Sequence, residues 1–215
     1  QSVSGALLDH ICRIWGGGAA PIPALHARIC ARIAELRAAD GGDLSGRLHV
    51  LPDFHGNRSP LADPLALGVI SGLSMDASFD GLCRLYWRTS VAVALSLRHI
   101  LERLGDSGHV IETLNVTGGH TRNPVLMELY ADVTGCSVIA PLAPDAVLLG
   151  TAMAASVAAR IHPDLAAAGR AMHRGGVSRP PNPAAAARFE RDWHVFRAMH
   201  RHRAEIDALL AEAPV

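Results

Sequence analysis

The sequence predicts an α/β domain that is rich in helices. Of its 215 residues, 49% are hydrophobic and 19% are charged, which is enough apolar material for a sizeable core. Apolar residues recur three and four positions apart over several long segments, a spacing typical of amphipathic helices. In the second half of the chain, short apolar runs alternate with such segments, as strands and helices do in α/β folds. We treat residues 1–215 as one domain, because this length is most simply explained by a single core.

The first half of the chain contains predicted helices on either side of a strand pair. The apolar stripes of the first two helices are Leu7, Leu8, Ile11 and Ile14, and then Leu25, Ile29, Ile33 and Leu36. Extended runs at Leu48–Leu51 and Gly68–Leu73 predict strands, and the proline-rich segment Pro52–Pro64 predicts a shaped loop between them. A long helix from Leu82 to Gly105 is apolar on most sides, so we expect it in the interior.

The second half alternates between the two kinds of element. Strands are predicted at 113–116 and 137–140, and helices at 124–134, 145–159, about 164–174 and about 184–210. A glycine- and proline-rich joint separates the last two helices. This order of strand and helix supports the α/β class.

Charge and hydropathy exclude several classes of partner. Lys+Arg and Asp+Glu are both 20, and no basic patch stands out, so we expect no nucleic-acid partner. No run approaches the roughly 20 apolar residues that span a bilayer, and the first residues lack the basic start of a signal peptide. We therefore expect a cytoplasmic protein without a membrane partner. Its oligomeric state stays open, a homo-oligomer included.

The cysteines and histidines do not predict a metal site. The four cysteines are far apart and form no C-x-x-C pair, which favours buried, reduced thiols. Three histidines, His194, His200 and His202, share the last helix, but spacings of six and two do not place them on one face. We expect a solvated helix face there.

A glycine turn, residues 117–123, carries the strongest local signal for ligand binding. It lies between a predicted strand and a helix, with Asn123 as N-cap and Pro124 as the first helical residue. Gly118 and Gly119 have no Cβ, so the backbone can approach a ligand closely. Taken alone, such a pair is more often an ordinary strand-to-helix turn.

Four segments occur in the order in which FGGY carbohydrate kinases have them: Asp53–Pro60, Gly68–Leu73, the Gly118–Gly119 turn and Asp145–Ala152. Together they resemble that family over essentially the whole chain, and most closely its ribulokinase-like pentulose kinases. The resemblance implies a ribonuclease-H-like (actin-like ATPase) fold, as the C-terminal half of a two-domain sugar kinase. In that family the second domain holds most of the adenosine and the first holds most of the sugar.

The resemblance also implies roles for individual residues. Gly118, Gly119 and Asn123 match the family's turn beside the adenine and ribose, although the N-cap role of Asn123 needs no ligand. We expect a Cβ at Gly119 to intrude on ligand space or to disfavour a positive φ. Small residues Gly150, Thr151 and Ala152 match a helix that packs close to this turn.

The loop after the first strand has a second set of polar candidates. Asp53, His55, Asn57 and Arg58 are suited to contact substrate or an opposing domain. Equally, Asp53 and Arg58 are suited to pair and hold the loop in shape, and we favour this structural role.

Catalysis is expected to require residues outside this chain. Phosphoryl transfer needs a carboxylate for the attacking hydroxyl, groups that bind phosphate, and usually Mg²⁺. In the family the catalytic Asp and the phosphate loop precede the segment that Gln1-Ser2 resembles, so we assign no catalytic or metal-binding residue here. Gly42-Asp43 and Gly105-Asp106 fit solvated turns instead. We expect ATP and Mg²⁺ as cofactors, sugar binding through the absent half, and no activity of this chain alone. The alternative is a non-catalytic nucleotide-binding or assembly module.

Overall fold

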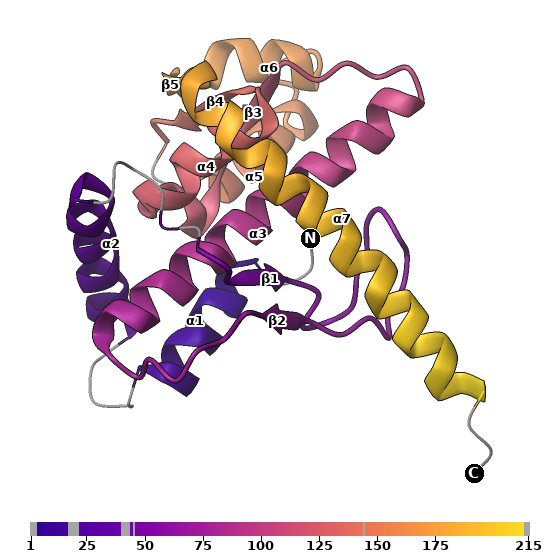
Figure 1. Ribbon diagram of the computed structural model, residues 1–215. Helices are drawn as coiled ribbons and strands as arrows, with labels where there is room; N and C mark the ends of the chain where they lie inside the picture. Colours follow the sequence, from indigo (N-terminus) through magenta and orange to yellow (C-terminus); the bar gives the residue numbers. More distant parts are fainter. Residues whose placement is uncertain (1–3, 17–21, 40–43, 45, 144, 213–215) are drawn as a thin grey trace.

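A computed structural model describes residues 4–16, 22–39, 44, 46–143 and 145–212. The chain opens with helices α1 (Ser4–Trp15) and α2 (Ile22–Ala39), which pack against each other and against the long helix α3 (Phe79–Asp106) (Figure 1). The buried positions are those of the two predicted stripes, except that Ile14 is exposed and Cys12 is buried in addition. The first half of the chain thus forms a layer of helices before the strand–helix alternation of the second half begins.

Helix α3 forms the centre of the domain. The side chain of Ser78 accepts a hydrogen bond from the Gly81 N–H and caps its first turn. The helix is buried from Leu82 to Ser96, apart from partly exposed Arg84, because α1, α2, α4 and strand β1 cover its sides. Its last turns, from Glu102 onward, are exposed. The predicted interior position is therefore confirmed for the first two thirds of the helix only.

Among the described residues, the domain has two small sheets. Strands β1 (His49–Leu51) and β2 (Val69–Ser71) pair antiparallel. In the other sheet, β3 (Thr113–Asn115) pairs parallel with β4 (Ser137–Pro141), and β4 pairs antiparallel with β5 (Gly176–Arg179). Helix α4 (Pro124–Thr134) connects β3 to β4 and packs on α3. The first sheet packs on α3 through β1, and the second packs on α4 through β4 and β5.

Strand β5 was not predicted from the sequence, which indicated only a joint there. All of its residues are exposed, so no alternation of apolar and polar positions marks it. Its pairing depends on hydrogen bonds to β4, which lies about 40 residues earlier in the sequence.

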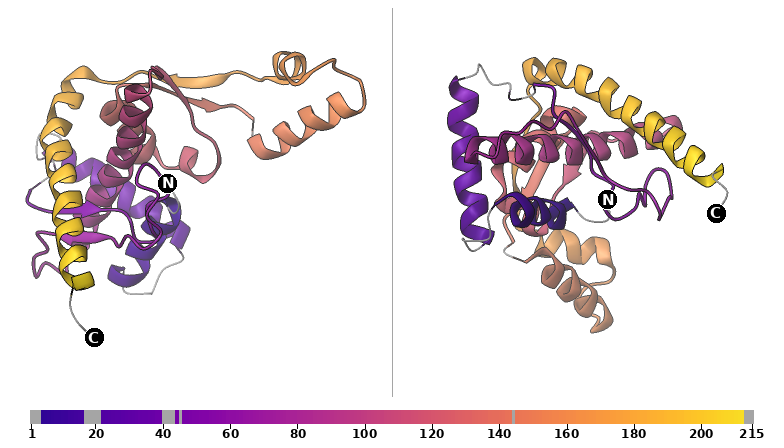
Figure 2. Two further views of the ribbon diagram at one scale, coloured as in Figure 1. Left: turned by 90° about the vertical axis from the view of Figure 1, so that its right-hand side faces the viewer. Right: turned by 60° about the horizontal axis from the view of Figure 1, so that its bottom comes forward.

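Helices α5 (Ala146–Ala158) and α6 (Leu165–Met172) form an outlying hairpin. Figure 2 shows them set apart from the rest of the domain at the end of the extended β4–β5 ribbon. Helix α5 packs chiefly on α6, and its apolar Val147 and Leu148 are 75% and 67% exposed. The side chains of Asp145 and Asp164 cap the two helices at their first turns.

The last helix, α7 (Pro183–Glu212), runs across α4, β1 and α3. Its buried positions, which follow a three- and four-residue spacing, are Phe189, Asp192, Trp193, Phe196, Met199 and Arg203. Within the part of the chain that the structure describes, no helix combines the length and the apolar character needed to cross a bilayer. The cysteines are free, as expected, with Cys12, Cys83 and Cys136 buried and Cys30 partly buried.

Candidate functional site

The glycine turn begins with the short helix η1 (Gly118–Arg122), which follows β3 and leads into α4. Gly118 has φ 77°, in the left-handed region that L side chains rarely adopt, whereas Gly119 lies outside that region. The expectation of a positive φ at Gly119 was therefore wrong. A Cβ at either position would meet no described atom within 4 Å, so the backbone borders open space. A ligand can approach it there.

Asn123 is the N-cap of α4, as the sequence predicted. Its Oδ1 accepts hydrogen bonds from the N–H groups of Val125 and Leu126 at 3.0 and 3.2 Å. Its Nδ2 donates to the Tyr86 hydroxyl at 2.9 Å. Because an amide carries two hydrogens, one N–H is left for a further acceptor. Contact of Asn123 with a nucleotide stays a prediction.

His120 ties the turn to its surroundings, a role that the sequence did not indicate. Its Nε2 lies 2.9 Å from Oγ of Ser4 in α1, and its Nδ1 lies 2.9 Å from the Tyr130 hydroxyl in α4. Burial lowers the pKa of His120, so the ring is neutral near pH 7 and donates through one nitrogen while it accepts through the other. No local pattern marks this residue, because both partners come from other elements.

The small residues of α5 do not pack against the glycine turn in this structure. Gly150, Thr151 and Ala152 are exposed, and a Cβ at Gly150 would meet no described atom within 4 Å. The Thr151 hydroxyl donates to the carbonyl of Val147 in its own helix. The predicted close packing is therefore not formed, and a role beside the nucleotide stays a prediction.

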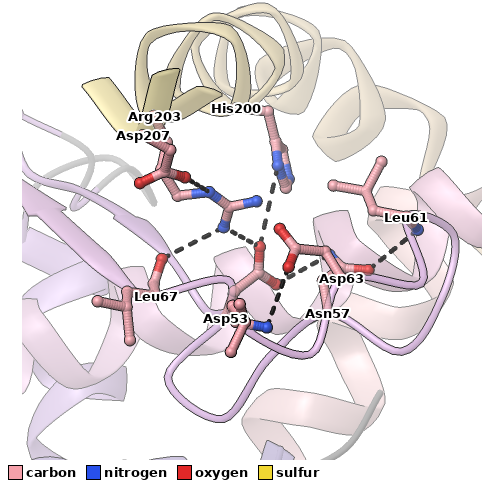
Figure 3. Close-up of polar contacts among 9 residues, drawn as sticks. Asp53, Asn57, Leu61, Asp63, Leu67, His200, Arg203 and Asp207 are labelled. Atoms are coloured by element: carbon pink, nitrogen blue, oxygen red, sulfur yellow. Dashed lines mark hydrogen bonds and ion pairs between the residues drawn. The ribbon is translucent and has the colours of Figure 1, made fainter. Parts of the chain in front are cut away.

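The loop between β1 and β2 is held by a buried cluster that includes α7 (Figure 3). Arg203 forms an ion pair with Asp53 and donates to the carbonyl of Leu67 at 3.2 Å. Asn57 Nδ2 donates to Asp53 Oδ1 at 3.0 Å. Burial raises the pKa of Asp53, and the hydrogen bonds from Arg203 and Asn57 oppose this shift. Asp53 and Asn57 therefore hold the loop in shape.

Arg58 does not pair with Asp53, contrary to the structural role that the sequence favoured. Arg58 and His55 are exposed, and they line a cavity of about 680 Å³ together with Phe54, Leu65 and Leu67. The loop is thus divided into a buried polar side, which is structural, and an exposed side, which is available to a substrate or another domain. Of the four candidate residues in the loop, His55 and Arg58 are the two whose side chains are exposed and available to a substrate or to another domain.

His200 is buried, which corrects the prediction of a solvated face for all three histidines. His194 and His202 are exposed, but the side chain of His200 is only 10% exposed and contacts the rings of His99 and Phe196. Its Nδ1 lies 3.9 Å from Asp53 Oδ2, too far for a hydrogen bond. Burial, and secondarily the charge of Arg203, lower the pKa of His200 to about 4.

The buried His200 should make the protein less stable in mild acid. Since an unfolded histidine has a pKa of about 6.5, His200 binds up to one more proton in the unfolded chain than in the folded chain between pH 6.5 and about 4. Stability therefore falls as the pH decreases through this window, and His200 alone should contribute a loss of about 2 kcal/mol at pH 5. Urea denaturation at pH 7 and pH 5 measures this loss in the free energy of unfolding.

His200→Gln should make the free energy of unfolding depend less on pH, whereas His202→Gln, an exposed control on the same helix, should leave the pH dependence unchanged. Equal slopes for all three proteins would contradict this assignment.

The described residues contain no group of three or more His, Cys, Asp or Glu side chains that could hold a metal ion. The glycine turn offers uncharged donors instead. The N–H groups that open a helix have no intrahelical partner, and one amide hydrogen of Asn123 is available beside them. Such donors, next to a backbone bordered by open space, fit the ring nitrogens and hydroxyls of a nucleoside. They do not fit Mg²⁺, which prefers carboxylate and water oxygens.

Comparison with known proteins identifies relatives of the chain. The model of the C-terminal domain of the FGGY family of carbohydrate kinases matches residues 1–159. An FGGY carbohydrate kinase domain-containing protein from Danio rerio is 38% identical over 169 residues, 79% of this chain and 31% of that protein. A D-ribulokinase from Saccharomyces cerevisiae is 32% identical over 170 residues, 74% of this chain and 24% of that protein.

Solved structures of carbohydrate kinases are also similar to this chain. The xylulose kinase from Rhodospirillum rubrum has a TM-score of 0.73 and 28% identity, over 94% of this chain and 38% of that chain. These matches confirm the predicted fold class, helix-rich α/β of the ribonuclease-H-like (actin-like ATPase) type. The chain spans less than a third of the length of the two curated relatives described above.

Proposed function

This chain belongs to the FGGY family of carbohydrate kinases, and we propose that residues 1–215 form the nucleotide-binding C-terminal domain of an ATP-dependent kinase. The observation that carries the proposal is the glycine turn. It lies inside the segment that matches the family model, and open space borders the backbone of Gly118 and Gly119. Its donors suit the adenosine part of ATP, with Asn123 as an additional contact.

The proposed acceptor is a hydroxyl of a pentulose, such as ribulose, or of a related sugar or polyol. Similarity to a D-ribulokinase and to a xylulose kinase supports this class. The loop that carries His55 and Arg58 is the part of this chain proposed to face the sugar or the opposing domain, because these two exposed polar side chains line its otherwise mostly apolar cavity. The residues that select the sugar are proposed to lie in the other domain.

In this proposal the chain supplies binding rather than chemistry. Bound ATP with Mg²⁺ would supply the transferable phosphoryl group and neutralise its charge. The glycine turn would orient the nucleoside, which contributes through positioning of the reacting groups. We assign no catalytic base to this chain, so the carboxylate that accepts the hydroxyl proton is proposed to come from outside it.

We expect the 215-residue chain to bind MgADP and MgATP in the range of about 1 µM to 1 mM that is usual for enzyme substrates. Because the sugar contacts are proposed to lie elsewhere, the same chain should show little binding of ribulose. It should also release no ADP from ATP in the presence of ribulose, xylulose, ribitol or glycerol. Calorimetry measures the binding, and a coupled ADP assay measures the turnover.

Two results would contradict this proposal. Tight binding of ribulose in the absence of nucleotide would reverse the assignment of the domain. Sugar-dependent release of ADP would show that a base and phosphate-binding groups are present in this chain. Binding of ADP without any turnover is the expected combination.

A further inference from the structure

A series of hydrogen-bonded polar side chains leads from α1 to the glycine turn; Tyr86 is fully buried, and the others are partly exposed. Asp9 in α1 accepts a hydrogen bond from His26 Nε2 in α2 at 2.7 Å. His26 Nδ1 lies 2.9 Å from the hydroxyl of Tyr86 in α3, and this hydroxyl accepts from Asn123 Nδ2 at 2.9 Å. Three helices are thereby joined to Asn123, the residue that caps α4. No sequence pattern predicts these hydrogen bonds of His26 and Tyr86, and neither residue is among the proposed nucleotide contacts.

With one proton on the His26 ring, the chemistry of these groups sets the direction of the hydrogen bonds. The Asp9 carboxylate only accepts, so the proton of His26 is on Nε2. Nδ1 of the same ring then accepts from the Tyr86 hydroxyl, which in turn accepts from the Asn123 amide. Burial raises the pKa of Tyr86, so its hydroxyl keeps the proton that it donates. Each group therefore has a partner in a continuous series that ends at the turn.

The two glycines of the turn have no side chains with which to hold it, so its position depends on His120 and on the Asn123 amide. Gly118 and Gly119 border open space, and η1 is a single short helix. The orientation of the Asn123 side chain decides which of its atoms caps α4 and which amide hydrogen is available to a ligand. Tyr86, which is fully buried, holds that amide from the side opposite its capping oxygen. The Cys30 thiol also lies near Asn123, with Sγ 3.7 Å from Oδ1.

We propose that His26, although it lies outside the turn, is a positioning residue for nucleotide binding, acting through Tyr86 and Asn123. This inference rests on the proposed function of the turn. His26 fixes the direction in which the Tyr86 hydroxyl points, and Tyr86 fixes the amide of Asn123. When the amide is held in advance, less conformational freedom is lost on binding, and affinity rises.

Four variants of the 215-residue chain test the inference. His26→Leu removes the hydrogen bonds of the ring to Asp9 and Tyr86, and Tyr86→Phe breaks the next link while it keeps the buried aromatic ring. His26→Gln retains one donor and one acceptor and serves as the conservative rescue. Thr89→Val removes another buried hydroxyl of α3, one that donates to the carbonyl of Leu85 and has no link to the turn. It controls for a general loss of stability.

Two measurements separate positioning from structural support. The first is hydrogen exchange of the amides of residues 119–126 without nucleotide, and the second is the Kd for MgADP. His26→Leu and Tyr86→Phe should each accelerate exchange in this segment by about fivefold to tenfold and raise the Kd by a similar factor, the effect of one lost buried hydrogen bond. His26→Gln and Thr89→Val should stay within about twofold of the parent in both measurements.

The outcomes distinguish this inference from the proposed function. If the parent chain binds no MgADP yet both breaking variants loosen residues 119–126, the proposed function fails and the link to the turn stands without a role in binding. If exchange in the turn is unchanged in His26→Leu and in Tyr86→Phe, the inference is wrong, whatever the nucleotide affinity. If Thr89→Val loosens the turn as much as Tyr86→Phe does, the effect is one of general stability and the inference is also wrong.

Discussion

Replacement of Asp192 by alanine is expected to lower the free energy of unfolding by about 3–5 kcal/mol, because it leaves a buried guanidinium without its counter-charge. Arg88 and Asp192 are each 3% exposed and form two hydrogen bonds, at 2.8 and 3.0 Å. Arg88 also donates to the Leu48 carbonyl at 2.6 Å and to His49 Nδ1 at 2.7 Å. This arginine therefore joins α3, β1 and α7. Urea denaturation of the variant and the parent measures the loss.

A matched control lies two residues earlier on α7. Glu190 pairs with Arg98 at 2.7 Å, but the Glu190 side chain is 54% exposed. Because water screens such a pair, Glu190→Ala should cost less than about 1 kcal/mol. A double variant, Arg88→Met with Asp192→Leu, removes both buried charges and should recover most of the loss. Equal losses for Asp192→Ala and Glu190→Ala would show that burial of the pair has no energetic consequence.

Gly119→Val is expected to weaken MgADP binding by at least about tenfold while the free energy of unfolding changes little. Gly119 does not have a positive φ, and a Cβ there meets no described atom within 4 Å. Without ligand, the new side chain therefore has space. With a nucleotide in that space, as proposed, the valine methyl groups would overlap it. Calorimetric titration beside a thermal melt measures both quantities.

Gly118→Val is the matched comparison, because the two glycines differ only in backbone conformation. At φ 77° a β-branched residue is strained, so this variant should lose about 1–2 kcal/mol of stability without any ligand. If Gly119→Val instead melts earlier and binds MgADP like the parent, the turn is structural only. The nucleotide assignment would then be wrong.

Helix boundaries in this protein could be predicted because the signals that set them are local. Helix α4 begins at Pro124 after the Asn123 cap and ends before Gly135, which adopts φ 74°, and each of these residues acts within one turn of the helix. Asp145 and Asp164 set the starts of α5 and α6 in the same way. The glycine turn could be predicted for the same reason, since a strand end, two glycines and a capped helix are adjacent in sequence.

The partners of buried polar groups could not be predicted, because each depends on elements that are far apart in the chain. Arg203 reaches Asp53 across 150 positions, so Arg58, the nearer cation, was wrongly favoured. His200 is buried because α7 lies over the loop between β1 and β2 and against His99 of α3. Strand β5 exists through its pairing with β4.

By itself, then, the sequence determined the order of the helices, most of the strands and the position of the glycine turn, since spacing, caps and glycines act over a few residues. Tertiary structure decided which charges are buried, which histidines have a lowered pKa and which side chains hold Asn123. These outcomes follow from desolvation and hydrogen bonding between α1, α2, α3 and α7, and both depend on distances in space that a linear pattern does not contain.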